Sequence, residues 1–145
     1  MSLNNPYAQY RQTSIETATQ TKLIIMLHDG AIRFLQQAIQ AMKEKDFYHQ
    51  SLYINKAIAI VDHLWSTLNM KEGGEVAAAL SHLFPYMHDR LTYGNLKDDP
   101  EPLQETQVYL RTLRDAWAAA EEMKSSSETK PEPTQIERGE LSMAA

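Results

Sequence analysis

Cysteine is absent from the 145-residue sequence, and this absence excludes several kinds of protein at once. Neither a disulfide nor a thiolate metal site can form without cysteine, and thiol catalysis is impossible. A secretory signal peptide is also missing, because residues 1–20 are polar where such a signal has an apolar core. Together these features favour a protein of the cytoplasm, where thiols are kept reduced.

The sequence also lacks a long apolar run and a cluster of basic residues. Asp29 and Arg33 interrupt its most hydrophobic stretch, so no segment approaches the roughly 20 apolar residues that a membrane-spanning helix needs. The formal net charge is −5, and lysine and arginine are scattered along the chain. A nucleic-acid-binding protein would normally present a basic surface. We therefore expect neither membrane insertion nor nucleic-acid binding.

The usual metal-binding and catalytic motifs are missing as well. A di-iron bundle needs Glu-x-x-His on two helices, and the sequence contains no Glu-x-x-His. His82 and His88 are six residues apart, about 240° around a helix, so they cannot share one face. The Gly73-Gly74 pair lacks the Gly-Lys-Ser/Thr context of a phosphate loop. The sequence therefore predicts no metal site, no cofactor and no enzyme activity.

What the sequence does contain is four apolar stripes with helical spacing. The widest lies between Leu23 and Ala38 and covers roughly 160° of a helix, more than the roughly 100° that a surface helix needs. A face this wide has to be covered from more than one side, either by its own chain or by a partner. Gly30 lies beside Phe34 on this helix, either as a position of close packing or as a tolerated glycine.

Capping residues and breaks in the pattern set the ends of the first two expected helices. Thr19 is suited to cap the first helix, which runs to residue 44 or 45. Asp46 is suited to cap the second, which ends near Asn69 before the Gly73-Gly74 turn. The connection between the two helices is very short, so we expect them to be antiparallel neighbours.

The same signals set the third and fourth helices. The third begins near Glu75 and contains Pro85, which removes one backbone hydrogen bond and predicts a kink. Asp99 is suited to cap the fourth helix, with Pro100 at its first position, and this helix runs to Met123.

These features predict an all-α protein, an antiparallel four-helix bundle over residues 19–123. Residues 1–18 are expected to form a short N-terminal cap segment or helix. Residues 124–145 are rich in serine, proline and charged side chains, and they are expected to form a disordered C-terminal tail.

Several apolar residues lie off the four stripes. They can either close a compact bundle or form a surface for an amphipathic helix of a partner, and the spacing alone does not separate these alternatives. In the bundle they are Ile25, Met26, Leu52, Tyr86, Tyr93 and Leu96. Tyr7, Tyr10 and Ile15 are the sizeable apolar residues of the otherwise polar N-terminal segment.

Four blocks of the sequence resemble FliS, the family of flagellar secretion chaperones of flagellin. The first block is Asn5-Pro6-Tyr7 and Tyr10, followed by Thr17-Ala18-Thr19, Lys22-Leu23 and Met26-Leu27-His28-Asp29-Gly30-Ala31-Ile32-Arg33-Phe34-Leu35. The others are Leu68-Asn69-Met70-Lys71-Glu72-Gly73-Gly74-Glu75-Val76-Ala77, Tyr86-Met87-His88-Asp89-Arg90-Leu91 with Asn95-Leu96-Lys97-Asp98-Asp99, and Leu113-Arg114-Asp115-Ala116-Trp117. The chain departs from the family pattern at His28, where the family usually has tyrosine, and at Gln20 and Pro85.

The resemblance implies a cytosolic chaperone with no enzyme activity. Such a chaperone binds the C-terminal segment of flagellin, prevents its premature polymerisation, and assists its delivery to the flagellar type III export apparatus. The N-terminal segment would cover part of the binding surface in the free chaperone. We assign partner binding to Tyr7, Tyr10, Ile15, Ile25, Met26, Tyr86, Tyr93 and Leu96. The alternative is a structural four-helix interaction module without chaperone activity.

Overall fold

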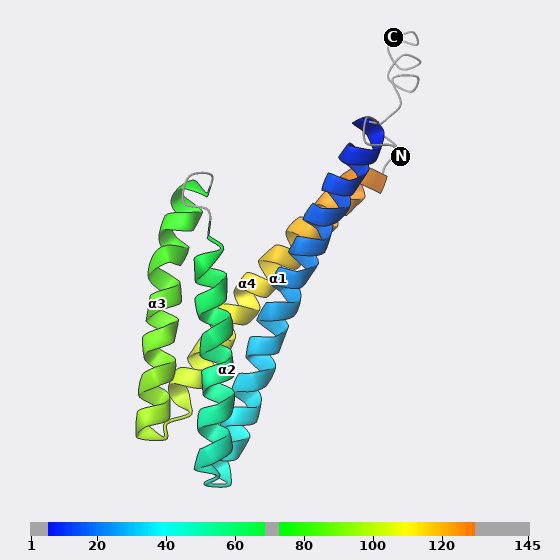
Figure 1. The fold of residues 1–145 in the computed structure, drawn as a ribbon. Helices are drawn as coiled ribbons and strands as arrows, with labels where there is room; N and C mark the ends of the chain where they lie inside the picture. Colours follow the sequence, from blue (N-terminus) through cyan, green and yellow to red (C-terminus); the bar gives the residue numbers. More distant parts are fainter. Residues whose placement is uncertain (1–5, 69–72, 130–145) are drawn as a thin grey trace, which may run out of the picture.

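The computed structural model describes the backbone of residues 6–68 and 73–129, and within it the side chains of residues 19–68, 73–124 and 126. Four helices make up the described chain (Figure 1). They are α1 (Pro6–Lys43), α2 (Phe47–Ser66), α3 (Gly74–Lys97) and α4 (Glu101–Thr129). The predicted all-α fold with four helices is confirmed.

Each helix packs against two others, so the four form a ring in the order α1, α2, α3, α4. The short links between successive helices make neighbours antiparallel, as predicted for α1 and α2 (Figure 1). Apolar side chains from all four helices fill the centre of the ring and are almost fully buried. This core consists of Ala31, Leu35, Ala38, Ile39, Ile54, Ala57, Val61, Leu64, Phe84, Met87, Leu91, Leu103 and Leu110.

We call the end of the bundle that carries the α1–α2 and α3–α4 turns the closed end. Side-chain caps hold both turns, as predicted. The Asp46 carboxylate accepts a hydrogen bond from the His49 amide at 3.2 Å, at the start of α2. The Asp99 carboxylate accepts one from the Glu101 amide at 3.0 Å, at the start of α4. The fourth helix begins at Glu101, one residue later than the predicted start at Pro100.

A buried amide ties α2 to the turn between α3 and α4. Gln50 is 1% exposed, and its Nε2 donates to Asn95 Oδ1 at 3.1 Å and to Asp98 Oδ1 at 2.8 Å. Asp98 has a left-handed backbone with φ of 52°, a C-cap conformation that ends α3. Gln50 therefore fixes the position of this turn against the first turns of α2.

Three expected helix ends differ from those observed by more than two residues. The first helix begins at Pro6, not after a cap at Thr19, so it runs through the predicted boundary at residues 18 and 19. Proline suits a first helical position, and no glycine or proline interrupts residues 7–29. The second helix ends at Ser66, before Asn69, and the fourth continues beyond Met123 to Thr129.

Part of the predicted disordered tail is therefore helical, namely residues 124–129. The rest of that tail, residues 130–145, lies outside the described residues, as do residues 1–5 and 69–72. The third helix continues through Pro85 as a single element. The kink that Pro85 predicts stays a prediction.

The two ends of the molecule differ because the four helices differ in length. The 38 residues of α1 and the 29 of α4 exceed the 20 of α2 and the 24 of α3. Figure 1 shows α2 and α3 diverging from α1 and α4 toward the end opposite the two turns, which we call the open end. Beyond it, the first part of α1 and the last part of α4 extend away from α2 and α3 (Figure 1).

Candidate functional site

A groove of about 560 Å³ lies at the open end, where the helix pairs diverge. All four helices contribute to its walls, with α1 and α3 supplying most of the apolar side chains. The residues that line it are Gln20, Leu23, Ile24, Leu27, His28, His63, Leu64, Thr67, Leu68, Gly73, Val76, Ala77, Leu80, Phe84 and Trp117. None of these described lining residues is Asp, Glu, Lys or Arg, so the groove suits an apolar, uncharged occupant.

The groove has a buried floor and an exposed rim. Phe84 and Leu64 form part of the floor and are each 4% exposed, in continuity with the bundle core. On the rim, Leu23 is 51% exposed, Val76 69% and Trp117 39%. Large apolar side chains that gather at this exposure are typical of surfaces that contact another molecule.

His28 is the polar side chain placed deepest in the groove wall. It is 1% exposed, and its Nδ1 lies 2.7 Å from the Ile24 carbonyl oxygen, to which the Nδ1–H tautomer donates. Burial lowers the pKa of His28 below the ordinary value of 6.5, outweighing the opposing effects of the Ile24 hydrogen bond and the Asp29 charge. The imidazole is therefore neutral at pH 7, in keeping with the uncharged wall.

Within the described residues, no group of three or more His, Asp or Glu side chains is arranged to hold a metal ion. None of the helices in that part of the chain is long and apolar enough to cross a membrane.

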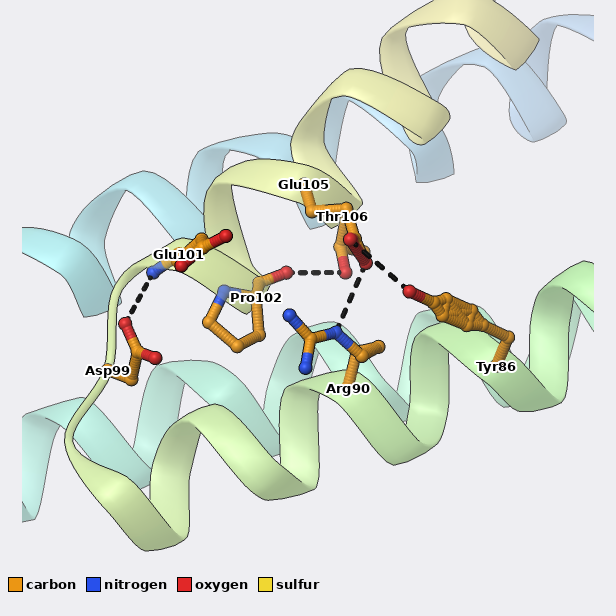
Figure 2. Close-up of polar contacts among 7 residues, drawn as sticks. All are labelled: Tyr86, Arg90, Asp99, Glu101, Pro102, Glu105 and Thr106. Carbon is orange, nitrogen blue, oxygen red and sulfur yellow. Dashed lines mark hydrogen bonds and ion pairs between the residues drawn. The ribbon is translucent and has the colours of Figure 1, made fainter.

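A second cluster lies where α3 packs against α4, and it contains two of the residues assigned to partner binding. The Tyr86 hydroxyl donates to Glu105 Oε2 at 3.2 Å, and Arg90 Nε donates to Glu105 Oε1 at 3.2 Å (Figure 2). The hydrogen bond to Glu105 raises the pKa of Tyr86. The Arg90 guanidinium lies over the Tyr93 ring at 5.5 Å. The two hydrogen bonds to Glu105 join α3 to α4, and Tyr86 and Tyr93 remain 38% and 45% exposed.

Comparison with known proteins decides the family. The model of the family described as "Flagellar protein FliS" matches residues 3–124, most of the chain. The chain belongs to the FliS family. It is 36% identical to the flagellar secretion chaperone FliS of Bacillus subtilis over 120 residues, which cover 83% of this chain and 89% of that protein. It is 35% identical to the flagellar secretion chaperone FliS of Salmonella typhimurium over 113 residues, which cover 74% of this chain and 84% of that one.

The FliS match includes every residue that lines the groove. Sequence reasoning placed most of these residues in the bundle core rather than in a binding site. Leu23 and Leu27 belong to the wide stripe of the first helix, and the width of that stripe was the signal that more than one neighbour covers it. No feature of the sequence indicated that Val76 and Trp117 would be exposed, because their exposure depends on how far the helix pairs diverge.

The residues assigned to partner binding do not gather at one place in this FliS fold. Ile25 is half-buried and Met26 is 66% exposed, and both lie on α1 but outside the groove lining. Leu96 is 76% exposed in the last turn of α3, at the closed end. The side chains of Tyr7, Tyr10 and Ile15 lie outside the described residues, although their backbone belongs to α1. Partner binding at all these positions stays a prediction.

Proposed function

We propose that this FliS family member is an export chaperone that holds the C-terminal segment of flagellin in the groove at the open end. The chaperone acts in the cytosol, keeps flagellin from polymerising early, and assists its delivery to the flagellar type III export apparatus. The observation that carries the proposal is the groove itself, which is apolar, uncharged and open at its rim. The names of the relatives in Bacillus subtilis and Salmonella typhimurium support the chaperone role.

The chemistry of the groove suits a segment that folds as it binds. An amphipathic segment that is disordered alone can form a helix on an apolar surface and bury one face against it. Leu23, Val76 and Trp117 supply exposed apolar area on three different helices. A helix seated between them would contact all three and would meet no lysine, arginine or carboxylate from the described lining.

Tyr86, Tyr93 and the nearby Arg90 offer a second contact for a client longer than the groove. Tyrosine suits an interface because its ring is largely apolar and its hydroxyl can hydrogen-bond. We propose that the part of the client that extends beyond the groove contacts this surface. The same part of the client would contact Ile25, Met26 and Leu96.

Calorimetric titration with flagellin tests the proposal. Full-length flagellin from the same organism should bind, and flagellin that lacks its C-terminal segment should not. A structural module without chaperone activity would bind neither. Among the described residues, no arrangement of catalytic side chains supports an enzyme activity.

A matched pair of charge substitutions locates the site. Val76→Glu places a carboxylate in the groove rim, and we expect it to weaken flagellin binding more than about tenfold, because a buried unpaired charge costs several kcal/mol. Val108→Glu is the control, since Val108 is 57% exposed on α4 and does not line the groove. Equal affinities for the two variants would place the client elsewhere.

A further inference from the structure

Aromatic and basic side chains gather on a surface that α1 and α2 build together. The rings of Phe34 and Tyr53 stack with their centroids 6.2 Å apart and so join α1 to α2. The His49 ring continues this stack at 6.0 Å from Tyr53, and Tyr48 meets His49 edge-on at 5.1 Å. We call this surface the ring face. It consists of Arg33, Phe34, Tyr48, His49, Tyr53 and Lys56.

The ring face is separate from the groove and points away from α3 and α4. On α2, Tyr53 lies about 180° around the helix from Asp62, whose carboxylate is 2.8 Å from a histidine of α3. On α1, Phe34 lies about 140° from Asp29, which pairs with an arginine of α4. None of the ring-face residues lines the groove. An occupant of this face therefore leaves the groove open.

Two cations are held at the centre of the ring face. The Lys56 ammonium lies 5.4 Å from the centroid of the Phe34 ring, and the Arg33 guanidinium lies 5.9 Å from it. The two charges are therefore no more than 11.3 Å apart, which is the sum of these distances. Phe34 is partly buried against the bundle core, so packing limits the movement of the ring between the two cations.

Neither cation has a carboxylate partner among the described residues, since the ion pairs there do not include Arg33 or Lys56. Asp29, one turn before Arg33, pairs instead with Arg114 of α4 at 3.0 Å. The positions one turn before and after Lys56 hold no acidic residue. Two like charges that are held this close without a counter-charge favour the approach of an anionic group.

The rings indicate which kind of anion suits this face. Tyr48 is 72% exposed, so an occupant meets aromatic surface beside the charges. Tyrosine suits a protein interface because its ring is largely apolar and its hydroxyl can hydrogen-bond. A single-stranded nucleic acid also combines stacking with negative charge, but it needs a row of cations along its backbone. Two cations on a chain with a net charge of −5 match a short acidic peptide better.

We propose that the ring face binds an acidic segment of a second protein, in which one or two carboxylates lie beside an aromatic or aliphatic side chain. The carboxylates contact Arg33 and Lys56, and the apolar side chain lies against Tyr48 and Tyr53. An arginine and a carboxylate can form two parallel hydrogen bonds, which adds specificity to the contact. The proposal goes beyond the proposed function and does not depend on it.

An NMR titration of the full-length protein tests the proposal. The probe is the peptide Glu-Glu-Phe-Glu-Glu-Phe, and the matched control is Gln-Gln-Phe-Gln-Gln-Phe, both with blocked ends. We expect the Glu peptide to shift the amide signals of Arg33, Phe34, Tyr53 and Lys56, and the Gln peptide to shift them far less. Equal shifts with both peptides, or shifts centred on the groove, would overturn the proposal.

A matched pair of double variants tests the role of the two cations. Arg33→Gln/Lys56→Gln should weaken binding of the Glu peptide at least about tenfold, because both charge-assisted contacts are lost. Lys97→Gln/Arg111→Gln removes the same charge from exposed positions outside the ring face. It should weaken binding less than about twofold, because salt screens distant exposed charges. An equal loss in the two double variants would indicate unspecific attraction to positive charge and would overturn the proposal.

Three further measurements test the other possible occupants of the ring face. Removal of residues 130–145, which include Glu132, Glu137 and Glu140, should leave the ring-face signals and the peptide affinity unchanged. Dilution of the protein should leave the same signals in place. A change in the first would assign the face to residues 130–145 of the same chain, and a change in the second to another copy. Either change would overturn the proposal, as would an oligothymidine strand that binds more tightly than the Glu peptide.

Discussion

The closed and open ends of the bundle contain the same types of apolar residue on the same helices. These side chains are buried at the closed end and partly exposed at the open end. At the closed end Leu35, Leu91 and Leu103 are each 0% exposed. At the open end Leu23 is 51% exposed although it lies on the same stripe of α1 as Leu35. The difference lies in the number of neighbours, since Leu35 lies in the core that all four helices build, whereas the diverging pairs leave Leu23 partly uncovered. A single stripe therefore supplies both a core and one wall of an open groove.

Polar contacts account for part of this difference. Caps and the Gln50 amide hold the turns at the closed end. At the open end α1 and α4 remain joined, partly through Arg114 Nε and Asp29 Oδ1 at 3.0 Å, while α2 and α3 diverge from them. The α1–α4 pair and the α2–α3 pair therefore persist at both ends, and only the contact between these two pairs is lost at the open end.

The largest expected effect is on the free energy of unfolding. It comes from replacing leucine by alanine at a fully buried position of α1 and, for comparison, at a partly buried one. Leu35→Ala removes a fully buried side chain and is expected to lower the free energy of unfolding by about 2–5 kcal/mol. Leu27→Ala, two turns away, removes a partly buried side chain of the groove wall and should cost less than about 2 kcal/mol. Urea denaturation of both variants checks the prediction. Equal losses would mean that the open end is packed as tightly as the closed end.

Two glycines test how tightly the closed end is packed. A methyl group at Gly94 would lie 2.7 Å from Leu103 Cδ1 and 3.0 Å from the Asp99 carbonyl oxygen, so Gly94→Ala should destabilise by about 1–3 kcal/mol. A methyl group at Gly30 would lie 3.6 Å from Ile60 Cδ1, an ordinary contact, so Gly30 is tolerated rather than required. Gly30→Ala should be neutral or stabilise by up to about 1 kcal/mol. Thermal melts of the two variants with opposite signs would support this assignment.

Acid should lower the stability of the folded protein through His28, which lies in the groove wall at the open end. The unfolded chain takes up a proton at His28 near pH 6.5, whereas burial makes the folded protein take it up only at lower pH. Between these two pKa values the unfolded state binds more protons, so stability falls as the pH drops below about 6.5. His28→Gln should show a shallower loss between pH 7 and pH 5 in denaturation experiments. An unchanged slope would show that other groups control this range.

The smallest effect is expected from removing residues 130–145. Their composition offers little apolar surface to bury, so neither end of the bundle should depend on them. The melting temperature should change by less than about 5 °C, which corresponds to roughly 1 kcal/mol or less for a domain of this size. Differential scanning calorimetry of the shortened protein provides the measurement, and a larger drop would show that the segment packs against the bundle.

Apolar spacing and caps were sufficient to predict the fold. The stripes gave the four helices and their antiparallel order, and Asp46 and Asp99 marked two helix starts that the structure confirms. The start of α1 was wrong because a polar stretch can be helical without an apolar stripe of its own. Thr19 was suited to be a cap, but a capping residue also fits inside a helix when the residues before it favour helix.

The groove could be predicted only in part. The width of the α1 stripe indicated a second covering neighbour, but the sequence did not say whether that neighbour was the chain itself or a partner. The divergence of the helix pairs depends on packing across the whole ring, and no single motif encodes it. Tyr86 and Tyr93 were singled out because they lie off the main stripe. The hydrogen bond from Tyr86 to Glu105 shows that such a residue can also join two helices, whereas Tyr93 contacts Arg90 of its own helix.

The Gln50 contacts should make local opening of the closed end rare. An amide that bridges α2 and the α3–α4 turn makes the closed end a single cooperative unit, so its backbone hydrogens should exchange with solvent only when the whole chain unfolds. The first turns of α3, from Gly74 to Ala77, have no such bridge among the described contacts and can open alone. If the client helix binds as we propose, it would enter and leave the groove through such sub-global openings, far more often than the protein unfolds.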